Sequence, residues 1–296
     1  MQPHETVLRS VHMKDGHPSE TAAYVTMGRA VAHARARLPG FSDPLAMQLL
    51  PEELRDVTER RLRGAWPRNR RECVLAAIAE VMERLMGPRT VMIDRALHNL
   101  PPAAQVVIVG AGLDSRAYRL PGISGSMVFE LDHPATQALK RARVADVLPV
   151  ARQLRHVAAD LTRESLGGAL QRAGHSTDAP TAWIFEGVIT YLTRDQVNAA
   201  VAAMAARSAP GSRLLATYNE PNWVGRVLGN RLSAWRSEPA RTVFSRDEMR
   251  ELLARHGFSV RADTDGLQRV VELGVAPSLI ERTFVRFHHV VIAERG

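Results

Sequence analysis

The sequence contains a single cysteine, Cys73, and this scarcity excludes several kinds of protein. One cysteine cannot close an intrachain disulfide, and it argues against a zinc site built from cysteine thiolates. Long apolar runs are missing too, since none reaches the ~18 residues that a membrane-spanning helix needs. The opening residues MQPHETVLRS hold no apolar core of a signal peptide. We therefore expect a cytoplasmic protein with no membrane partner.

Lysine is also scarce, although the chain is basic. The formal net charge is +8, and Lys14 and Lys140 are the only lysines. The arginines are scattered along every segment, without a basic block and without interleaved aromatic residues. Because clustering of basic residues makes a nucleic-acid footprint, this pattern favours a solvated arginine-rich surface. We predict no nucleic-acid partner, and an acidic small substrate agrees with the charge.

The hydrophobic pattern divides the chain into two parts. Its 296 residues, 45% of them hydrophobic, suffice for one substantial core with an added cap. Apolar residues at helical spacing predict helices over residues 19–38, 51–63 and 71–86. Further along, short apolar runs alternate with amphipathic segments, which is typical of a parallel, doubly wound α/β sheet. We predict a helical cap over residues 1–86 and a Rossmann-like domain over residues 87–296.

Seven short apolar runs are candidates for the strands of that sheet. They are Val106–Val109, Met127–Leu131, Arg155–Ala158, Ala182–Phe185, Arg213–Thr217, Phe258–Ala262 and Phe284–Ala293. Capping boxes at Thr193-x-x-Gln196 and Ser245-x-x-Glu248 predict the starts of two helices. The last two runs are joined by about twenty residues in which we find no capping box, so we predict an antiparallel C-terminal strand.

The turn after the first strand, GAGLDS, is the first candidate for a ligand site. Ligands of doubly wound sheets bind beyond the carboxyl ends of the strands. Gly110 and Gly112 lack a Cβ, so their backbone approaches a ligand closely, although a plain tight turn would also use them. A dinucleotide site has Gly or Ala where Ser115 stands, and the carboxylate of Asp114 would repel a pyrophosphate. Asp114 suits a cationic ligand such as S-adenosylmethionine, or a helix cap.

Two acidic residues mark the end of the second strand, VFELDHP. Glu130 and Asp132 have the same parity, so both could face one side of the sheet. Asp132 lies twenty residues after Gly112, the spacing expected of an acid that accepts hydrogen bonds from ribose hydroxyls. NAD and S-adenosylmethionine share this ribose, so the position does not separate the two ligands.

The third and fourth strands also end in acidic residues. Asp160 could accept a hydrogen bond from an adenine amine while Leu161 covers the ring, or Asp160 could cap the next helix. Glu186 ends a buried strand, where a carboxylate is costly unless its charge is used or paired. We predict that Glu186 faces the cationic end of the ligand.

Several stretches together resemble a known family. They are SETAAYVTMGRA, FSDPLA, PRTVMID, VVIVGAGLDSRAYRL, VFELDHPATQALKR, AADL and AWIFEGVITYL. In these the chain resembles the leucine carboxyl methyltransferase-like family of class I S-adenosylmethionine-dependent methyltransferases. The closer similarity is to its bacterial branch, which includes tetracenomycin-type polyketide O-methyltransferases. The resemblance runs from about Ser19 to the C-terminus, and GAGLDSRAYRL is its most specific part.

The resemblance implies a role for each matching residue. Arg89 matches the arginine that binds the methionine carboxylate of the cofactor, and Gly110 matches the glycine of the cofactor loop. Asp132, rather than Glu130, matches the ribose acid. The remaining matches are the adenine pair, Asp160 and Leu161, and the acid near the methionine end, Glu186. The implied cofactor is S-adenosyl-L-methionine, and its product is S-adenosyl-L-homocysteine.

Residues near the carboxyl edge are candidates for the chemistry itself. Methyl transfer from a sulfonium needs no acid because the leaving group is neutral, whereas a phenol acceptor benefits from a base. His133 is a base candidate by type, and the start of a helix at Pro134 is its alternative role. Tyr191 follows the fourth strand and could bound the methyl site.

The acceptor should lie under the N-terminal helices and under a lid insertion near residues 219–244. Tyr218, Trp223 and Trp235 are the candidate substrate contacts. We predict an O-methyltransferase that acts on a carboxylate or hydroxyl of a small, acidic or aromatic molecule, such as a polyketide-like secondary metabolite. A protein C-terminal carboxyl methyltransferase, a nicotinamide-dependent oxidoreductase and a non-catalytic S-adenosylmethionine-binding protein are the alternatives. We predict no metal.

Overall fold

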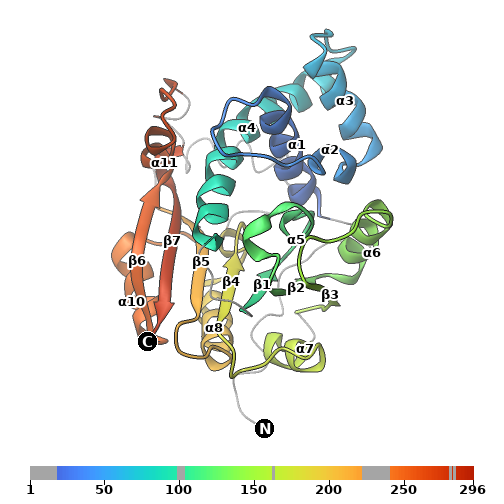
Figure 1. Ribbon diagram of the computed structural model, residues 1–296. Helices are drawn as coiled ribbons and strands as arrows, with labels where there is room; N and C mark the ends of the chain where they lie inside the picture. The colour runs from blue at the N-terminus through green and yellow to red at the C-terminus, as the bar shows by residue number, and fades with distance from the viewer. Residues whose placement is uncertain (1–18, 99–103, 162–163, 222–240, 280–281, 283–284) are drawn as a thin grey trace.

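The structure is a computed structural model, in which residues 19–98, 104–161, 164–221, 241–279, 282 and 285–296 are described (Figure 1). Most of the predicted lid, with Trp223 and Trp235, lies outside these residues. Within them, no helix combines the length and the apolar character needed to cross a bilayer.

A seven-stranded sheet forms the centre of the molecule, with strand order β3-β2-β1-β4-β5-β7-β6. Its bounds are β1 Gln105–Val109, β2 Met127–Asp132, β3 Gln153–Ala158, β4 Thr181–Phe185, β5 Arg213–Asn219, β6 Phe258–Asp265 and β7 His288–Arg295. Strand β7 is antiparallel to both neighbours, while the pairings among β1 to β5 are parallel. The doubly wound sheet with an antiparallel C-terminal strand is therefore as predicted.

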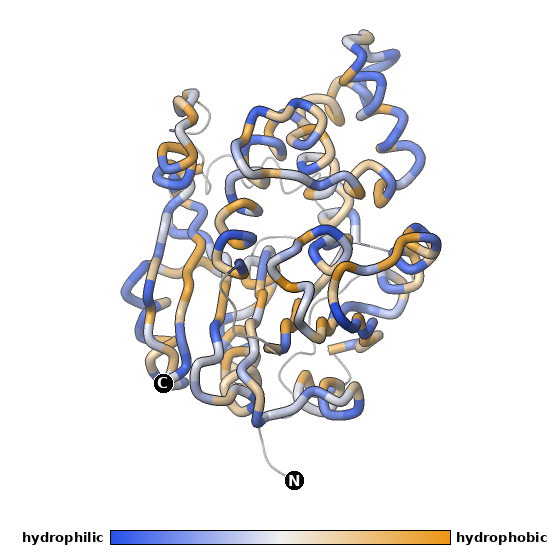
Figure 2. The backbone as a smooth tube through the Cα atoms, viewed as in Figure 1, coloured by the Kyte–Doolittle hydropathy of each residue, from blue (hydrophilic) through white to orange (hydrophobic). Residues whose placement is uncertain are grey.

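Helices cover both faces of the sheet, so its inner strands are apolar on both sides. Val106 and Ile108 of β1 pack with the cap helices, whereas Val107 and Val109 pack toward the helices of the other face. The cap helices are α1 Glu20–Arg35, α2 Ala46–Leu49, α3 Glu52–Leu62 and α4 Arg70–Leu97; the others are α5 Arg116–Arg119, α6 Pro134–Arg143, α7 Leu166–Arg172, α8 Arg194–Ala206, α10 Arg246–Arg255 and α11 Gly266–Glu272. Figure 2 shows hydrophobic residues along the inner strands and mixed hydropathy along the helices.

Helix α4 is longer than predicted and passes through the predicted domain boundary at residue 86. Gly87 and Pro88 suggest a helix end, yet the helix continues to Leu97. A Cβ at Gly87 would lie 2.2 Å from Leu38 Cδ1, so this glycine permits close packing between α4 and the segment after α1. Helix α4 therefore belongs to the cap and also carries Arg89, a residue of the candidate site.

Capping explains where the later helices begin. Both predicted capping boxes are present, at Thr193 before α8 and at Ser245 before α10. A third, which we did not predict, is formed by Asp265 and Gln268 at the start of α11. Asp265 is also the last residue of β6, so the strand leads straight into its helix. The link between β6 and β7 thus contains a capped helix, in contrast to the sequence analysis.

Candidate functional site

The turn between β1 and α5 requires its glycines. Gly110 and Gly112 have φ angles of 69° and 50°, in the left-handed region that other residues rarely adopt. A Cβ at Gly110 would lie 2.6 Å from Val188 Cγ2, and one at Gly112 would lie 3.0 Å from Ala22 Cβ. Any side chain here would strain the backbone and crowd the loop after β4 or helix α1. Backbone conformation and close packing within the protein therefore both require glycine at these two positions.

Asp132, at the end of β2, faces this turn. Its Oδ2 accepts a hydrogen bond of 2.5 Å from the Gly112 amide, and its Oδ1 accepts one of 2.7 Å from the His133 amide. A carboxylate has about four lone-pair positions, so each oxygen keeps one acceptor position. This geometry fits the two hydroxyls of a ribose. Burial raises the pKa of Asp132, although the hydrogen bonds from Gly112 and His133 act in the opposite direction.

Arg89 and Glu186 are brought together from α4 and the end of β4. The Arg89 Nε donates a hydrogen bond of 2.6 Å to Glu186 Oε1. Burial acts to raise the pKa of Glu186, but the charges of Arg89 and Arg116 outweigh it and lower that pKa. A guanidinium and a carboxylate side by side complement the carboxylate and the ammonium of an amino-acid ligand. The methionine moiety of S-adenosylmethionine is such a group, so these residues fit the cofactor.

An ion-pair chain of eight residues continues from Arg89 and Glu186 into the cap. Its members, in order of contact, are Arg89, Glu186, Arg116, Asp114, Asp94, Arg119, Asp43 and Arg29, with Asp114 as a branch on Arg116. Four arginines thereby meet four carboxylates, so the formal charges of the chain balance. Because most of these side chains are buried, their mutual pairing offsets part of the cost of desolvation.

Arg116 is the centre of this ion-pair chain. It is 1% exposed and reaches Asp94 Oδ1 at 2.6 Å, Glu186 Oε2 at 2.8 Å and Asp114 Oδ2. The other Asp114 oxygen accepts a hydrogen bond of 2.7 Å from the Arg116 amide. Burial acts to raise the pKa of Asp114, but the charges of Arg116 and Arg29 hold it well below its usual range. Both Asp114 oxygens thus accept hydrogen bonds from Arg116, the N-cap residue of α5 is Ser115, and the predicted cofactor contact of Asp114 stays a prediction.

The sequence analysis gave no role to five members of the ion-pair chain. They are Arg29, Asp43, Asp94, Arg116 and Arg119. All five nevertheless lie inside stretches that carry the family resemblance, such as FSDPLA and PRTVMID. The motifs therefore contained these charged residues, but the sequence alone does not indicate which of them form ion pairs with one another.

Glu130 does not reach the glycine turn, so its prediction as a cofactor contact is corrected. It is fully buried, and its Oε2 lies 2.6 Å from Lys140 Nζ and 3.3 Å from His156 Nδ1. Lys140 of α6 forms an ion pair with the Glu130 carboxylate, to which we had assigned ribose binding. The prediction failed because parity along a strand fixes the face of the sheet but not the partner on that face.

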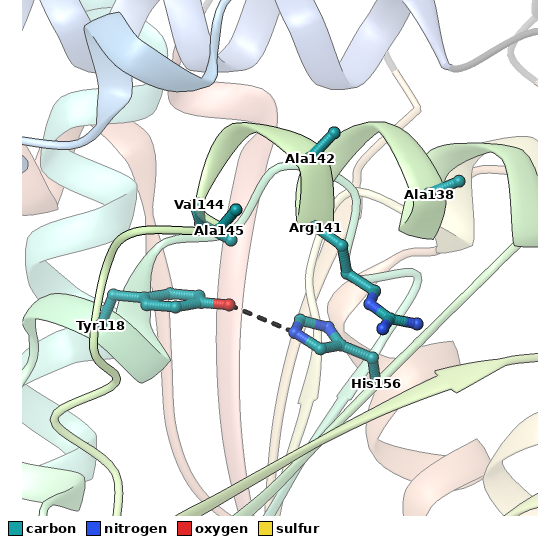
Figure 3. A pocket seen from close by; sticks show the side chains of 7 residues that line it. All are labelled: Tyr118, Ala138, Arg141, Ala142, Val144, Ala145 and His156. Atoms are coloured by element: carbon teal, nitrogen blue, oxygen red, sulfur yellow. Dashed lines mark hydrogen bonds between the residues drawn. The ribbon is translucent and has the colours of Figure 1, made fainter.

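A cavity of about 570 Å³ lies beside His156, which contacts Glu130 (Figure 3). Its lining residues are Tyr118, Ala138, Arg141, Ala142, Val144, Ala145 and His156. The Tyr118 hydroxyl lies within hydrogen-bond distance of His156 Nε2, at 3.2 Å. None of the residues predicted to bind the cofactor lines it, so this cavity is distinct from the candidate site.

Asp160 and Leu161 follow β3 close to Asp132. The Ala159 amide donates a hydrogen bond of 3.0 Å to the Asp132 carbonyl, which ties this loop to the end of β2. Leu161 is partly buried against the core. The structure therefore brings the predicted adenine pair next to the predicted ribose acid, and its adenine role stays a prediction.

The predicted acceptor residues lie in different surroundings. His133 accepts a hydrogen bond of 3.3 Å from the Ala135 amide through Nδ1 and caps α6, which is its alternative role. Tyr191 ends a short 3-10 turn, Ile189–Tyr191, beyond the Glu186 strand end, and is partly exposed.

Tyr218 is corrected as a substrate contact, since it is 1% exposed and its hydroxyl donates a hydrogen bond of 2.6 Å to Asp263. Burial and this carboxylate raise its pKa. Its ring stacks on His289 at 4.8 Å. We had predicted an acceptor contact because Tyr218 ends a parallel strand, but the side chain points between β5 and the outer strands.

Comparison with known proteins agrees with this geometry. The family model of leucine carboxyl methyltransferase matches residues 22–205. A Mycobacterium sp. strain JLS protein is 42% identical over 147 residues, which are 49% of this chain and 48% of that protein. That match thus spans about half the length of the relative. A Mycolicibacterium vanbaalenii protein is 32% identical over 279 residues, 87% of this chain and 89% of that protein. The names of both relatives assign them provisionally to the S-adenosyl-L-methionine-dependent methyltransferases.

The fold has relatives among solved structures. One of them comes from Thermobifida fusca and is provisionally described as a methyltransferase. It has a TM-score of 0.56 at 15% identity, and the match covers 95% of this chain and 96% of that chain. At this identity the likeness shows the fold alone. The family match and the long alignment carry the assignment further: the chain belongs to the leucine carboxyl methyltransferase family of S-adenosylmethionine-dependent methyltransferases.

Proposed function

We propose that this chain transfers the methyl group of S-adenosylmethionine to a carboxylate or hydroxyl oxygen of a small molecule. The observation that carries the proposal is the convergence of the Gly110–Gly112 turn, Asp132 and the Arg89–Glu186 pair at the carboxyl edge of the sheet. Bound there, the cofactor would supply a methyl group on a sulfonium. The acceptor oxygen would bond to the methyl carbon in line as the carbon–sulfur bond breaks, and S-adenosylhomocysteine would leave as a neutral thioether.

Each group has one task in this proposal. Asp132 accepts hydrogen bonds from the ribose through its two remaining lone-pair positions, and Arg89 binds the methionine carboxylate. Glu186 accepts from the methionine ammonium. Methyl transfer then depends on holding the acceptor oxygen on the methyl axis and excluding water, because the leaving group is neutral.

The oxygen acceptor is supported by the family description and by the charge of the chain. The matching family is described by its action on a carboxyl group. A net charge of +8 favours an acidic acceptor. We favour a secondary metabolite, such as a polyketide-like acid or phenol, over a protein C-terminus because the resemblance of the cap to the eukaryotic phosphatase-methylating enzymes does not extend residue by residue.

Calorimetry with S-adenosylhomocysteine, and with NAD as the control, tests the cofactor. Binding of the former alone supports the proposal, and binding of NAD alone would make Asp132 a dinucleotide ribose acid and overturn it. A nicotinamide-dependent enzyme is disfavoured because Ser115 stands where a dinucleotide-binding turn has Gly or Ala.

Transfer of a radiolabelled methyl group to a panel of acids and phenols tests the acceptor. Methyl esters release methanol in mild alkali and methyl ethers do not, so the stability of the label distinguishes a carboxylate from a hydroxyl acceptor. Label in a protein C-terminus would favour the protein carboxyl methyltransferase alternative. Binding of S-adenosylhomocysteine without transfer to any acceptor would favour a non-catalytic protein.

A further inference from the structure

Arg269, on α11, is a buried arginine that has no carboxylate partner among the residues that the structure describes. It is 1% exposed, its Nη1 donates a hydrogen bond of 2.8 Å to the Thr264 carbonyl, and its Nε has no hydrogen-bond partner. Arg29 and Arg116, the other arginines buried to this extent in the described chain, each form an ion pair with a carboxylate. Burial of an unpaired charge is costly, so a missing anion at Arg269 requires an explanation.

The position of α11 brings Arg269 to the candidate site. Leu273, one helical turn after Arg269, shares a hydrophobic cluster with Val91 of α4, so this face of α11 packs against α4. Arg89 is on the same helix, two residues before Val91, so its side chain leaves another face of α4 and its guanidinium reaches Glu186 at the end of β4. In Figure 1, α11 lies above the ends of β6 and β7, beside α4.

The electrostatics of Arg269 point to the same neighbours. Burial lowers the pKa of Arg269 to about 9, and the positive charge of Arg89 contributes to the lowering. Asp265, Glu186 and Glu272 act in the opposite direction, but in the described chain none lies within ion-pair distance. Arg269 therefore lies within electrostatic range of Arg89 and Glu186, the two residues assigned to the amino-acid end of the ligand.

We propose that Arg269 and Arg89 together bind a carboxylate at the junction between methyl donor and acceptor; this inference rests on the proposed function. An anion between two guanidinium groups removes their repulsion, and a carboxylate matches their planar donor geometry. Arg89 uses its Nε for Glu186, which leaves its Nη groups for the ligand.

The carboxylate could come from the methionine moiety of the cofactor or from the acceptor, and a pair of ligands distinguishes these sources. S-adenosylhomocysteine carries the amino-acid carboxylate, whereas 5′-methylthioadenosine lacks it. If the cofactor is the source, Arg269→Gln raises the Kd of S-adenosylhomocysteine about tenfold and that of 5′-methylthioadenosine less than about twofold. Arg250→Gln, at a guanidinium that is 62% exposed on α10, is the matched control and should change neither value.

Benzoate tests the acceptor as the source, with neutral benzamide as its control. If the acceptor supplies the carboxylate, S-adenosylhomocysteine binds wild type and Arg269→Gln equally. Benzoate then binds the saturated wild type saturably, and binds Arg269→Gln about tenfold more weakly. Either pattern supports a carboxylate site at Arg269. Unchanged affinities for both S-adenosylhomocysteine and benzoate in Arg269→Gln would overturn it, while the proposed function would stand.

Two further measurements cover the remaining outcomes. If Arg269→Gln does not fold, Arg269→Lys keeps the charge and loses the planar fork, so it should show a smaller change in the same direction. If the acceptor is the source, the Tm of the wild type saturated with S-adenosylhomocysteine must also rise more with sodium benzoate than with benzamide at equal ionic strength, and equal effects would exclude the acceptor as the source. If the wild type does not bind S-adenosylhomocysteine, the proposed function fails, and benzoate added alone still tests the arginine pair.

Discussion

Asp132 serves the protein and, in the proposed function, the ligand as well. Its two oxygens already accept hydrogen bonds from Gly112 and His133, and these bonds fix the carboxylate before any ligand arrives. A side chain held in this way loses little conformational entropy on binding. Glu186 is held similarly by Arg89 and Arg116. At the scale of single residues, the site is therefore arranged in advance.

Replacing Asp132 with alanine should weaken the binding of S-adenosylhomocysteine by about 1–3 kcal/mol, because it removes hydrogen bonds to a charged acceptor. Calorimetry measures the change directly. Asp146→Ala, at an exposed aspartate after α6, is the matched control and should leave the Kd unchanged. Unchanged affinity in folded Asp132→Ala would show that this carboxylate does not hold the ribose.

His175 should make stability depend on pH. It is 5% exposed between Phe129 and Trp183, at ring distances of 5.5 and 5.3 Å. Burial, assisted by the charge of Arg207, lowers its pKa from 6.5 to about 4. Between these values the unfolded chain binds more protons than the folded chain, so stability falls as the pH drops from about 6.5 to about 4.

The loss should reach about 3 kcal/mol at most for this group. Urea unfolding of wild type and His175→Gln at neutral pH and near pH 4.5 measures it. The variant starts less stable, because it loses the ring contacts, but acidification should cost it less than it costs the wild type. An equal loss in both proteins would mean that His175 titrates normally in the folded state.

At the scale of elements, we expect the turn between β1 and α5 to tolerate substitution poorly. Gly110→Ala places a side chain at a positive φ, which costs about 1–2 kcal/mol, and sets its Cβ 2.6 Å from Val188 Cγ2. We expect lower stability in urea unfolding and weaker binding of S-adenosylhomocysteine. Gly125→Ala, with no atom within 4 Å of the added Cβ and no positive φ, should be close to neutral.

Adding Val188→Ala to Gly110→Ala separates the two causes. The double variant relieves the crowding but keeps the strained backbone, so it should recover part of the lost stability and not all of it. Full recovery would mean that backbone strain at Gly110 is negligible, and no recovery would mean that the contact with Val188 does not matter.

Local patterns predicted the elements well where the physics is local. Capping boxes and alternating apolar runs depend on residues a few positions apart, and the sequence therefore located α8, α10 and the seven strands. Helix α4 was cut short in the prediction because the reason for Gly87 is a contact with Leu38, on another element. The capping box of α11 was missed because Asp265 also ends a strand.

The site was predictable only in part, for the same reason. Gly110, Asp132 and Glu186 follow strands, so topology brings them to one edge of the sheet. Their partners cannot be deduced from spacing: Arg89 and Glu186 are 97 residues apart in the chain. Glu130 was assigned wrongly because nothing in its own strand indicates that Lys140 would be buried beneath it.

At the scale of the whole molecule, the ion-pair chain joins the cap to the sheet. Asp94 is its midpoint, at 2.6 Å from Arg116 and 2.7 Å from Arg119. Asp94→Ala leaves two buried guanidinium groups short of a partner, and we expect a loss of about 3 kcal/mol in the free energy of unfolding. Glu59→Ala, which removes a surface pair with Arg63, should cost about 0.5 kcal/mol or less.

Salt provides a second test of the Asp94 prediction. The stability difference between wild type and Asp94→Ala should change little as the salt concentration rises, because buried pairs are screened much less than exposed ones. A loss for Asp94→Ala as small as that for Glu59→Ala would mean that the cap and the sheet do not depend on this ion-pair chain.

The position of β7 has a consequence for synthesis of the protein. Strand β6 leaves the ribosome before β7, yet in the finished sheet β7 lies between β5 and β6 and is antiparallel to both. The nascent chain must therefore keep β6 away from the open edge of β5 until the last strand is made. A premature stop codon shortly before His288 would leave two exposed strand edges, which are prone to aggregate.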